Sequence, residues 1–243
     1  MRSLLFLGSG GSMITRTRVC SGILFGNKLL DCGFGVLSNL RRGGISLEQI
    51  DELYVTHMHA DHIGDFTAIV WAMQLEGRKK PLRVICSERT RQSLNKILDL
   101  QSTPEGFVKF KLLYMSPKEA AVQYCRTDHE PENLAYRVEL GGREMVYTGD
   151  TGYSRAVATL SEGVHALIHE ATFLRDQTEY ARATKHSTAG DAGRIAEEAK
   201  AKKLLLTHLS PLNDGREEEY VKEARTAYRG EVIVACDLLK VVV

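Results

Sequence analysis

The sequence predicts an α/β fold, because short aliphatic and β-branched runs alternate along the chain with longer stretches of helical periodicity. A length of 243 residues is enough to bury a large apolar core. The composition is ordinary, with 43% hydrophobic and 26% charged residues, which excludes collagen-like, low-complexity and disordered chains. No polar linker separates two parts, so we expect a single domain over residues 1–243 built from two related halves.

The expected strands are short apolar runs bounded by turn residues. Gly26-Asn27 and Gly141-Gly142-Arg143 each join two such runs and predict hairpins, and residues 31–35 predict a third turn. The expected strands are 4–7, 21–25, 28–31, 53–56, 83–86, 108–113, 122–126, 135–140, 144–148, 166–169, 204–207 and 231–235.

The expected helices follow from apolar residues that recur at helical spacing. One is predicted over residues 65–76 and another over 188–202, where Thr188 and Asp191 fit the start signal of a helix. Residues 46–49 carry a capping-box pattern and predict a short helix.

Charge and cysteine content restrict the partners and the compartment. The formal net charge is +1, so the chain lacks the overall basic surplus typical of proteins that bind nucleic acid through phosphate charge, and any such contact must be local. The five cysteines are scattered without a C-x-x-C pair, which predicts reduced thiols. The first apolar run stops at Gly8, and no later run could cross a bilayer. We therefore expect a cytoplasmic protein with no membrane partner.

The dominant chemical signal is the segment T-H-M-H-A-D-H at residues 56–62, directly after a predicted strand. In extended chain, residues two apart project to the same side, so His57 and His59 can bind one metal ion together. Asp61 and His62 follow where the chain turns into a helix and could bind a second ion. Imidazole and carboxylate ligands suit Zn²⁺, and they also accept Mn²⁺ or Fe²⁺.

Further ligand-type residues follow other predicted strands. His129, Asp150 and His208 each come just after a β-like run, and a carboxylate at position 150 could bridge two ions. Each of these residues alone is a weak signal. The repeated placement after strand ends is what makes all three candidate ligands.

This ligand set resembles the metallo-β-lactamase superfamily of two-metal hydrolases, whose H-x-H-x-D-H motif is matched at residues 57–62. The resemblance implies a four-layer αββα sandwich with two mixed sheets and two divalent metal ions, most simply Zn²⁺. It assigns the first ion to three histidines, the second to an aspartate and two histidines, and a bridging role to another aspartate. The ligands implied for the first ion are His57, His59 and His129. Those implied for the second ion are Asp61, His62 and His208, and the bridging residue is Asp150.

Within the superfamily the sequence is similar to the ribonuclease Z family. The similar segments are L-G-S-G-G-S at 7–12, D-C-G-F-G at 31–35, H-E-A-T-F at 169–173 and H-S-T at 186–188. The resemblance implies that His186, paired with Glu170, donates a proton to the leaving oxygen, and that Asp61 helps to manage the proton of the attacking water. It also implies a homodimer.

We therefore expect a two-metal phosphodiesterase that uses a metal-bound hydroxide and acts on RNA 3′ ends, including tRNA, or on small phosphodiesters such as cyclic nucleotides. Members of the family usually carry a long arm that grips tRNA between the third histidine ligand and the bridging aspartate. Here only twenty residues separate His129 from Asp150, which leaves no room for the arm. The alternatives are a hydrolase of a lactone, thioester or sulfate ester, and a non-hydrolytic di-iron or degenerate binding domain.

Overall fold

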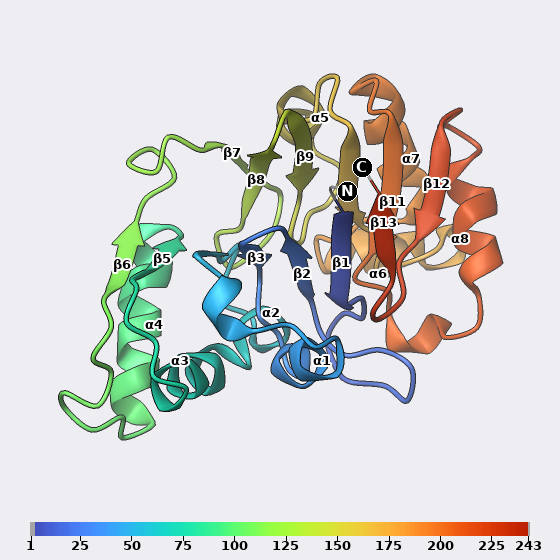
Figure 1. Ribbon diagram of the computed structural model, residues 1–243. Coiled ribbons are helices and arrows are strands. Elements are labelled where there is room, and N and C mark those ends of the chain that lie inside the picture. The colour runs from blue at the N-terminus through green and yellow to red at the C-terminus, as the bar shows by residue number, and fades with distance from the viewer. Residues whose placement is uncertain (1–2, 243) are drawn as a thin grey trace.

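The computed structural model describes residues 3–242 and contains two mixed β-sheets. In the seven-stranded sheet the neighbouring strands β3, β4, β5 and β6, which reach one edge, are parallel, and the other neighbours pair antiparallel. The C-terminal strand returns to pair with the N-terminal one, as the red and blue arrows in Figure 1 show. In spatial order the strands are β13 (Lys240–Val242), β1 (Ser3–Gly8), β2 (Gly22–Phe25), β3 (Lys28–Leu30), β4 (Glu52–Tyr54), β5 (Leu82–Ile85) and β6 (Leu112–Met115).

The second sheet has six strands, of which four are parallel neighbours and two are antiparallel additions at one edge. In spatial order they are β12 (Glu231–Val234), β11 (Lys203–Thr207), β10 (Ala166–Glu170), β9 (Arg143–Tyr147), β8 (Leu134–Leu140) and β7 (Gln123–Arg126). The fold class expected from the sequence is confirmed.

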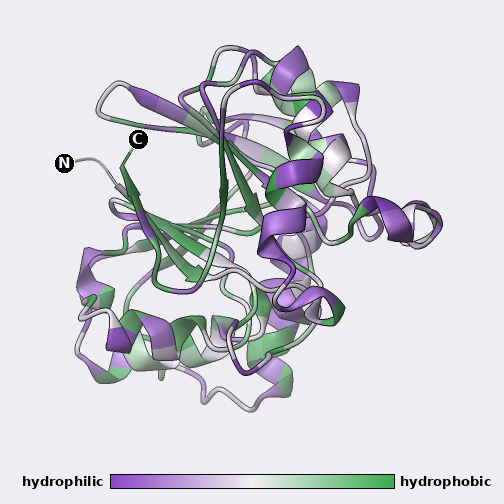
Figure 2. Ribbon diagram, turned by 90° about the vertical axis from the view of Figure 1, so that its right-hand side faces the viewer, coloured by the Kyte–Doolittle hydropathy of each residue, from purple (hydrophilic) through white to green (hydrophobic). Residues whose placement is uncertain are grey.

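Helices cover the outer face of each sheet, and Figure 2 shows the apolar strands lying inside them. The first sheet is covered by α1 (Val36–Arg42), α2 (Ala60–Ile63), α3 (Phe66–Leu75) and α4 (Glu88–Leu100). The second is covered by α5 (Arg155–Leu160), α7 (Ala189–Glu198) and α8 (Glu217–Ala224), with α6 (Thr178–Ala183) beside them. Three short 3₁₀ turns complete the described elements: η1 (Leu47–Gln49), η2 (Arg175–Gln177) and η3 (Pro211–Asn213).

Alternation along the strands explains the layers. In β4, Leu53 packs with the helices outside the first sheet, whereas the next residue, Tyr54, packs between the two sheets. In β10, Leu167 and Ile168 divide in the same way between the outer and the central layer. Successive side chains of a strand point to opposite faces, so strands that are apolar throughout must be covered on both faces. The αββα order follows.

Most predicted elements are present, and the differences concern one turn, two element ends and elements that the sequence analysis did not predict. The predicted hairpins at Gly26-Asn27 and Gly141-Gly142 join antiparallel strands, and their tips meet where Gly26 contacts Leu140. Residues 31–35 form no hairpin, because β3 pairs next with β4 in parallel and the chain crosses over through α1.

The other differences concern strand and helix ends. The strand expected at 108–113 is shifted to β6, because only Leu112–Met115 lies opposite the short β5. The helix expected at 46–49 is the 3₁₀ turn η1, in which Ser46 accepts from the amide of Glu48. Strand β13 and helices α1, α4, α5, α6 and α8 were not expected from the sequence. Among residues 3–242, no helix is long and apolar enough to cross a membrane.

Candidate metal centre and proton donor

The predicted site residues gather at the carboxyl ends of the strands of both sheets. His57 lies three residues after β4, and Asp150 and His208 follow β9 and β11. Parallel strands end at the same edge of a sheet, so residues that follow them converge. The antiparallel strand β7 delivers His129 to the same edge. Both sheets thus contribute to one site.

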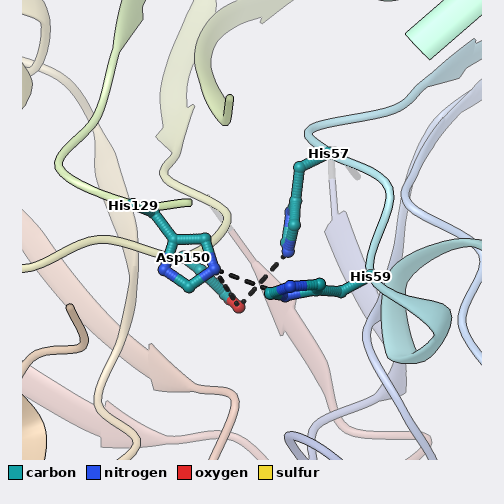
Figure 3. A group of neighbouring side chains, drawn as sticks. All are labelled: His57, His59, His129 and Asp150. Carbon is teal, nitrogen blue, oxygen red and sulfur yellow. Dashed lines mark hydrogen bonds and ion pairs between the residues drawn. The ribbon is translucent and has the colours of Figure 1, made fainter. Parts of the chain in front are cut away.

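One group consists of His57, His59, His129 and Asp150, whose ligand atoms all lie within 4.8 Å of one another (Figure 3). Nε2 of His129 is 3.3 Å from Nδ1 of His59. Oδ2 of Asp150 is 3.5 Å from Nε2 of His57 and 3.7 Å from Nε2 of His129. Three imidazole nitrogens and one carboxylate oxygen therefore face a common point.

The second group consists of Asp61, His62 and His208, also within 4.8 Å. The other oxygen of Asp150, Oδ1, lies 3.2 Å from Nε2 of His62 and 3.3 Å from Nε2 of His208. Oδ2 of Asp61 is 3.2 Å from Nε2 of His208. The two oxygens of Asp150 thus face different groups, which is the geometry of a bridging carboxylate.

The donor atoms fit divalent metal ions. Nε2 of His57, Nε2 of His62 and Oδ1 of Asp150 are buried and have no hydrogen-bond partner, which is costly for polar atoms unless an ion binds them. Two ligands about 2.1 Å from a tetrahedral Zn²⁺ would lie about 3.4 Å apart, close to the separations found in both groups.

Asp31 fixes the orientation of two of these histidines. Its Oδ2 accepts from Nδ1 of His62 at 2.7 Å and from the hydroxyl of Thr56 at 2.8 Å. Since Thr56 uses its proton on Asp31, its oxygen accepts from Nδ1 of His57, 3.0 Å away. Both histidines therefore carry their proton on Nδ1, and Nε2 keeps a free lone pair for a metal ion. Asp31 was not among the site residues expected from the sequence, although it begins the D-C-G-F-G segment.

The remaining histidines are oriented in related ways. Thr172 donates its hydroxyl proton to Glu170 and accepts from Nδ1 of His208 at 2.8 Å. His129 donates from Nδ1 to the carbonyl of Lys185 at 3.1 Å. A carbonyl oxygen belongs to the backbone, so the sequence had no signal for Lys185. Thr172 belongs to the H-E-A-T-F segment but was not among the expected site residues.

The electrostatics favour cations at the second group and neutral imidazoles at the first. Burial lowers the pKa of His57, His59 and His129, which keeps these ligands unprotonated. Burial would also lower the pKa of His62, but Asp150 and Asp31 raise it well above its usual value. The negative charge of Asp150 and Asp31 that raises this pKa also favours a divalent cation beside Nε2 of His62.

His186 stands beside both groups with a carboxylate behind it. Its ligand atom lies within 4.8 Å of those of Asp150 and His208, and its ring stacks on the ring of His208 at 5.5 Å. Its Nδ1 is 2.7 Å from Oε1 of Glu170, a fully buried residue. Oε1 of Glu170 also accepts from the amide of Thr151, and Oε2 accepts from the amide of Thr172. Burial would lower the pKa of His186, but Glu170 raises it to about 9. Glu170 therefore favours the protonated form of His186, the form that can donate a proton.

The Gly-rich turn after β1 closes the site on another side. The amide of Ser12 donates to Oδ2 of Asp61 at 2.6 Å. A Cβ on Gly11 would lie 2.5 Å from the ring of His208, so only glycine fits there without moving that ring.

Comparison with known proteins agrees with this geometry. The family model for the Beta-lactamase superfamily domain matches residues 27–209. The chain belongs to the beta-lactamase superfamily. A relative within it, Ribonuclease Z of Haloarcula marismortui, is 28% identical over 292 positions, covering 96% of this chain and 94% of that protein. The probable metallo-hydrolase YhfI of Bacillus subtilis is 30% identical over 237 positions, covering 94% and 95%.

Solved structures of the superfamily share the fold. The crystal structure of YhfI superposes with a TM-score of 0.83 at 29% identity, covering 98% of both chains. The short form of human tRNase Z has a TM-score of 0.82 at 22% identity, covering 99% of this chain and 98% of that one. The family resemblance expected from the sequence is confirmed.

The alignments of this chain with the two relatives differ in length. The alignment with the Haloarcula protein is longer than the 243 residues of this chain, so that relative has residues at positions where this chain has none. The alignment with YhfI covers 237 positions, which is fewer than the 243 residues of this chain. In this chain, the twenty residues between His129 and Asp150 contain β8, β9 and their two-residue turn. In extent, this superfamily member is therefore similar to YhfI.

Proposed function

We propose that this chain is a two-metal phosphodiesterase of the ribonuclease Z type, formed by a single hydrolase domain over residues 1–243. Divalent ions held there, Zn²⁺ in the simplest case and Mn²⁺ or Fe²⁺ with the same donors, would lower the pKa of a water molecule and neutralise phosphate charge. The proposed ligands of the first ion are His57, His59 and His129, those of the second are Asp61, His62 and His208, and Asp150 bridges.

The observation that carries the proposal is the pair of Glu170 and His186 beside the ligand groups. Hydrolysis of a phosphodiester releases an alkoxide oxygen, which needs a proton. With Nδ1 bonded to Glu170, His186 has Nε2 left to donate that proton. Asp61, held by the amide of Ser12, is placed to accept a proton from the attacking water. Of the alternative substrates, a thioester releases a thiolate, which is a much weaker base than an alkoxide and needs no such donor.

Metal-supplemented hydrolysis of a dinucleotide, UpU, and of bis(p-nitrophenyl) phosphate tests the proposal. Asp150→Ala should abolish turnover of both. His186→Ala should lower the rate on UpU about a hundredfold or more, and less on the p-nitrophenyl ester, because p-nitrophenolate leaves without a proton. His165→Ala is the matched control, since His165 lies away from the site beside Glu144, and should keep full activity.

Two outcomes would contradict the proposal. The first is no turnover of either diester by protein with two bound metal ions, which would favour lactone, thioester or sulfate-ester substrates. The second is an equal loss on both diesters in His186→Ala with its metal content intact, which would remove the proton-donor role.

The short segment between His129 and Asp150 supports substrates that do not need an arm. We therefore expect precursor tRNA to be cleaved no faster than a short single-stranded RNA with the same 3′ end. Cyclic nucleotides serve as the small-substrate comparison. The cytoplasmic location and the homodimer are also proposed from the likeness to ribonuclease Z, and light scattering on the purified protein tests the dimer.

A further inference from the structure

A cavity of about 540 Å³ opens beside His186, within the size range of small-molecule sites. It lies between the end of α6 and the start of α7, with Tyr153 and Gly152 on the opposite side. His186 lines this cavity and also lies within 4.8 Å of Asp150 and His208. A substrate whose phosphate sits at the candidate metal ligands can therefore reach this cavity past His186.

The cavity carries an excess of positive charge. Nζ of Lys185 lies 3.6 Å from Asp128, and the Arg194 guanidinium lies 3.5 Å from Asp191, so these pairs neutralise one another. Arg175 and Arg182 form no ion pair with any carboxylate among residues 3–242. The charged lining residues are Asp128, Arg175, Arg182, Lys185, Asp191 and Arg194.

The two unpaired arginines have a fixed relation to the proton donor. Arg182 lies in the last turn of α6, and the amide of His186 donates to the carbonyl of Ala181 next to it at 2.8 Å. The amide of Arg175, at the start of η2, donates to Glu223 at 2.7 Å. The first bond ties the end of α6 to the segment that carries His186. The second ties Arg175 to α8, whose Glu223 also accepts from the amide of Gly190 in α7.

We propose that this cavity binds a second phosphate group of the substrate, held by Arg175 and Arg182, while the scissile phosphate lies at the metal ligands. The inference rests on the proposed phosphodiesterase function and narrows its substrate class to molecules with two phosphates near each other. A guanidinium matches phosphate with two parallel hydrogen bonds, which makes unpaired arginines suited to it.

Two sources could supply the second phosphate: an internal diester of a longer RNA, or a terminal phosphate of a small nucleotide. The substrates UpU, UpUp, pUpU and UpUpU separate them. UpU has only the scissile phosphate, UpUp and pUpU add a terminal phosphate at either end, and UpUpU adds an internal one. We expect kcat/KM to rise about tenfold or more with the second phosphate, as charge-assisted hydrogen bonds would give.

Variants test whether the cavity arginines cause the rise in kcat/KM with the second phosphate. In the double variant Arg175→Gln with Arg182→Gln, the advantage of the phosphate-bearing substrates should shrink to about threefold or less. Arg143→Gln, an exposed arginine at the start of β9 and outside the cavity, should retain the full advantage. Uridine 3′,5′-bisphosphate gives a readout without turnover: by calorimetry the double variant should bind it about tenfold more weakly than wild type.

Failure of this inference differs from failure of the proposed function. If wild type hydrolyses bis(p-nitrophenyl) phosphate and UpU but gains nothing from a second phosphate, or if the double variant binds the bisphosphate as tightly as wild type, the cavity is not a phosphate site. If wild type hydrolyses neither bis(p-nitrophenyl) phosphate nor UpU, the proposed function fails, and bisphosphate binding still tests the cavity.

Discussion

Asp31 shows how one carboxylate can determine a site without being a ligand. Its Oδ2 receives hydrogen bonds from His62, Thr56 and the hydroxyl of Tyr147, and its Oδ1 receives the amide of Thr56. The residue is fully buried, and its φ of 55° lies in the left-handed region, which is strained for a residue with a Cβ. The hydrogen bonds that this conformation allows stabilise it.

Asp31→Asn should weaken metal binding about 10- to 100-fold, because an amide nitrogen in place of one oxygen cannot accept from His62 and Thr56 together. Competition with a chromophoric chelator measures the affinity. Tyr147→Phe is the matched control: it removes one donor, 2.9 Å from the same oxygen, and leaves the histidine contacts in place. Equal metal affinity of Asp31→Asn and wild type would contradict the orienting role.

The pH profile reports on His186. Because its pKa is raised to about 9 and it must be protonated to donate, kcat/KM on a dinucleotide should fall as pH rises through about 9. Glu170→Gln removes the charge that raises this pKa, so the alkaline limb should move to lower pH. His165→Ala should leave the limb unchanged. An alkaline limb that is the same in Glu170→Gln and wild type would exclude His186 as its origin.

At the scale of residues, spacing and strand ends were enough to predict which ligand-type side chains the structure brings together. His57 and His59 lie in one group, as expected for residues two apart in an extended segment. Asp61 and His62 lie in the other group, as expected where the chain turns into a helix. The partners that orient them could not be predicted in this way. The carbonyl of Lys185 and the hydroxyl of Thr172 become neighbours of the histidines only through the pairing of distant strands.

Helix α7 positions the H-S-T segment that contains His186. Thr188 caps it: its hydroxyl accepts from the amide of Asp191 at 3.1 Å, and the side chain of Asp191 accepts from the amide of Thr188 at 3.3 Å. Ser187 donates its hydroxyl to the carbonyl of Thr151 at 2.6 Å, which ties the same turn to the loop after β9. The start of this helix therefore also fixes the proton donor.

Thr188→Ala should lower the free energy of unfolding by about 1 kcal/mol, the usual contribution of an N-cap hydroxyl. Urea denaturation of metal-loaded protein measures this change. Thr184→Ala is the control, because Thr184 is exposed beyond the end of α6 and its hydroxyl bonds only to backbone carbonyls there. Its effect should stay within about 0.5 kcal/mol. A Thr188→Ala protein as stable as wild type would show that the cap is dispensable.

Long periodic segments and short turns were the elements that the sequence predicted well. The helix expected at 65–76 is α3 (66–75), and the start signal at Thr188 begins α7. Segments whose form depends on a distant partner were misjudged. β6 is limited by the length of β5, and β13 exists because β1 offers it an edge. No local pattern contains that information.

At the scale of the molecule, the first ligand group joins the two halves. His57 and His59 follow a strand of the seven-stranded sheet, whereas His129 and Asp150 belong to loops of the six-stranded one. A metal ion bound to all four would link the sheets at one edge. Strand alternation predicted an α/β fold, but the facing of two sheets came from the family resemblance, because periodicity does not specify which strands pair.

Removal of metal should therefore lower thermal stability. At a free metal concentration about 100 times the dissociation constant, binding adds about 2.7 kcal/mol, which corresponds to about 5–10 °C for a domain of this size. Thermal melts with and without EDTA, followed by readdition of Zn²⁺, measure the shift. Asp150→Ala should show a smaller shift because both groups lose a ligand. Identical melting temperatures of wild type with and without EDTA would contradict metal binding across the sheets.

The hairpin tips at Gly26 and Leu140 lie at the end of the strands away from the metal ligands. The candidate metal centre and these hairpin turns thus lie at opposite ends of the sandwich. Sequence drift, an inserted segment or an engineered handle at the Gly141-Gly142 turn would leave the reacting end untouched. Segments added at the hairpin end can therefore change over evolution while the residues of the candidate metal centre stay the same. For the same reason, the protein could be anchored to a surface through its hairpin end, with the candidate metal centre free.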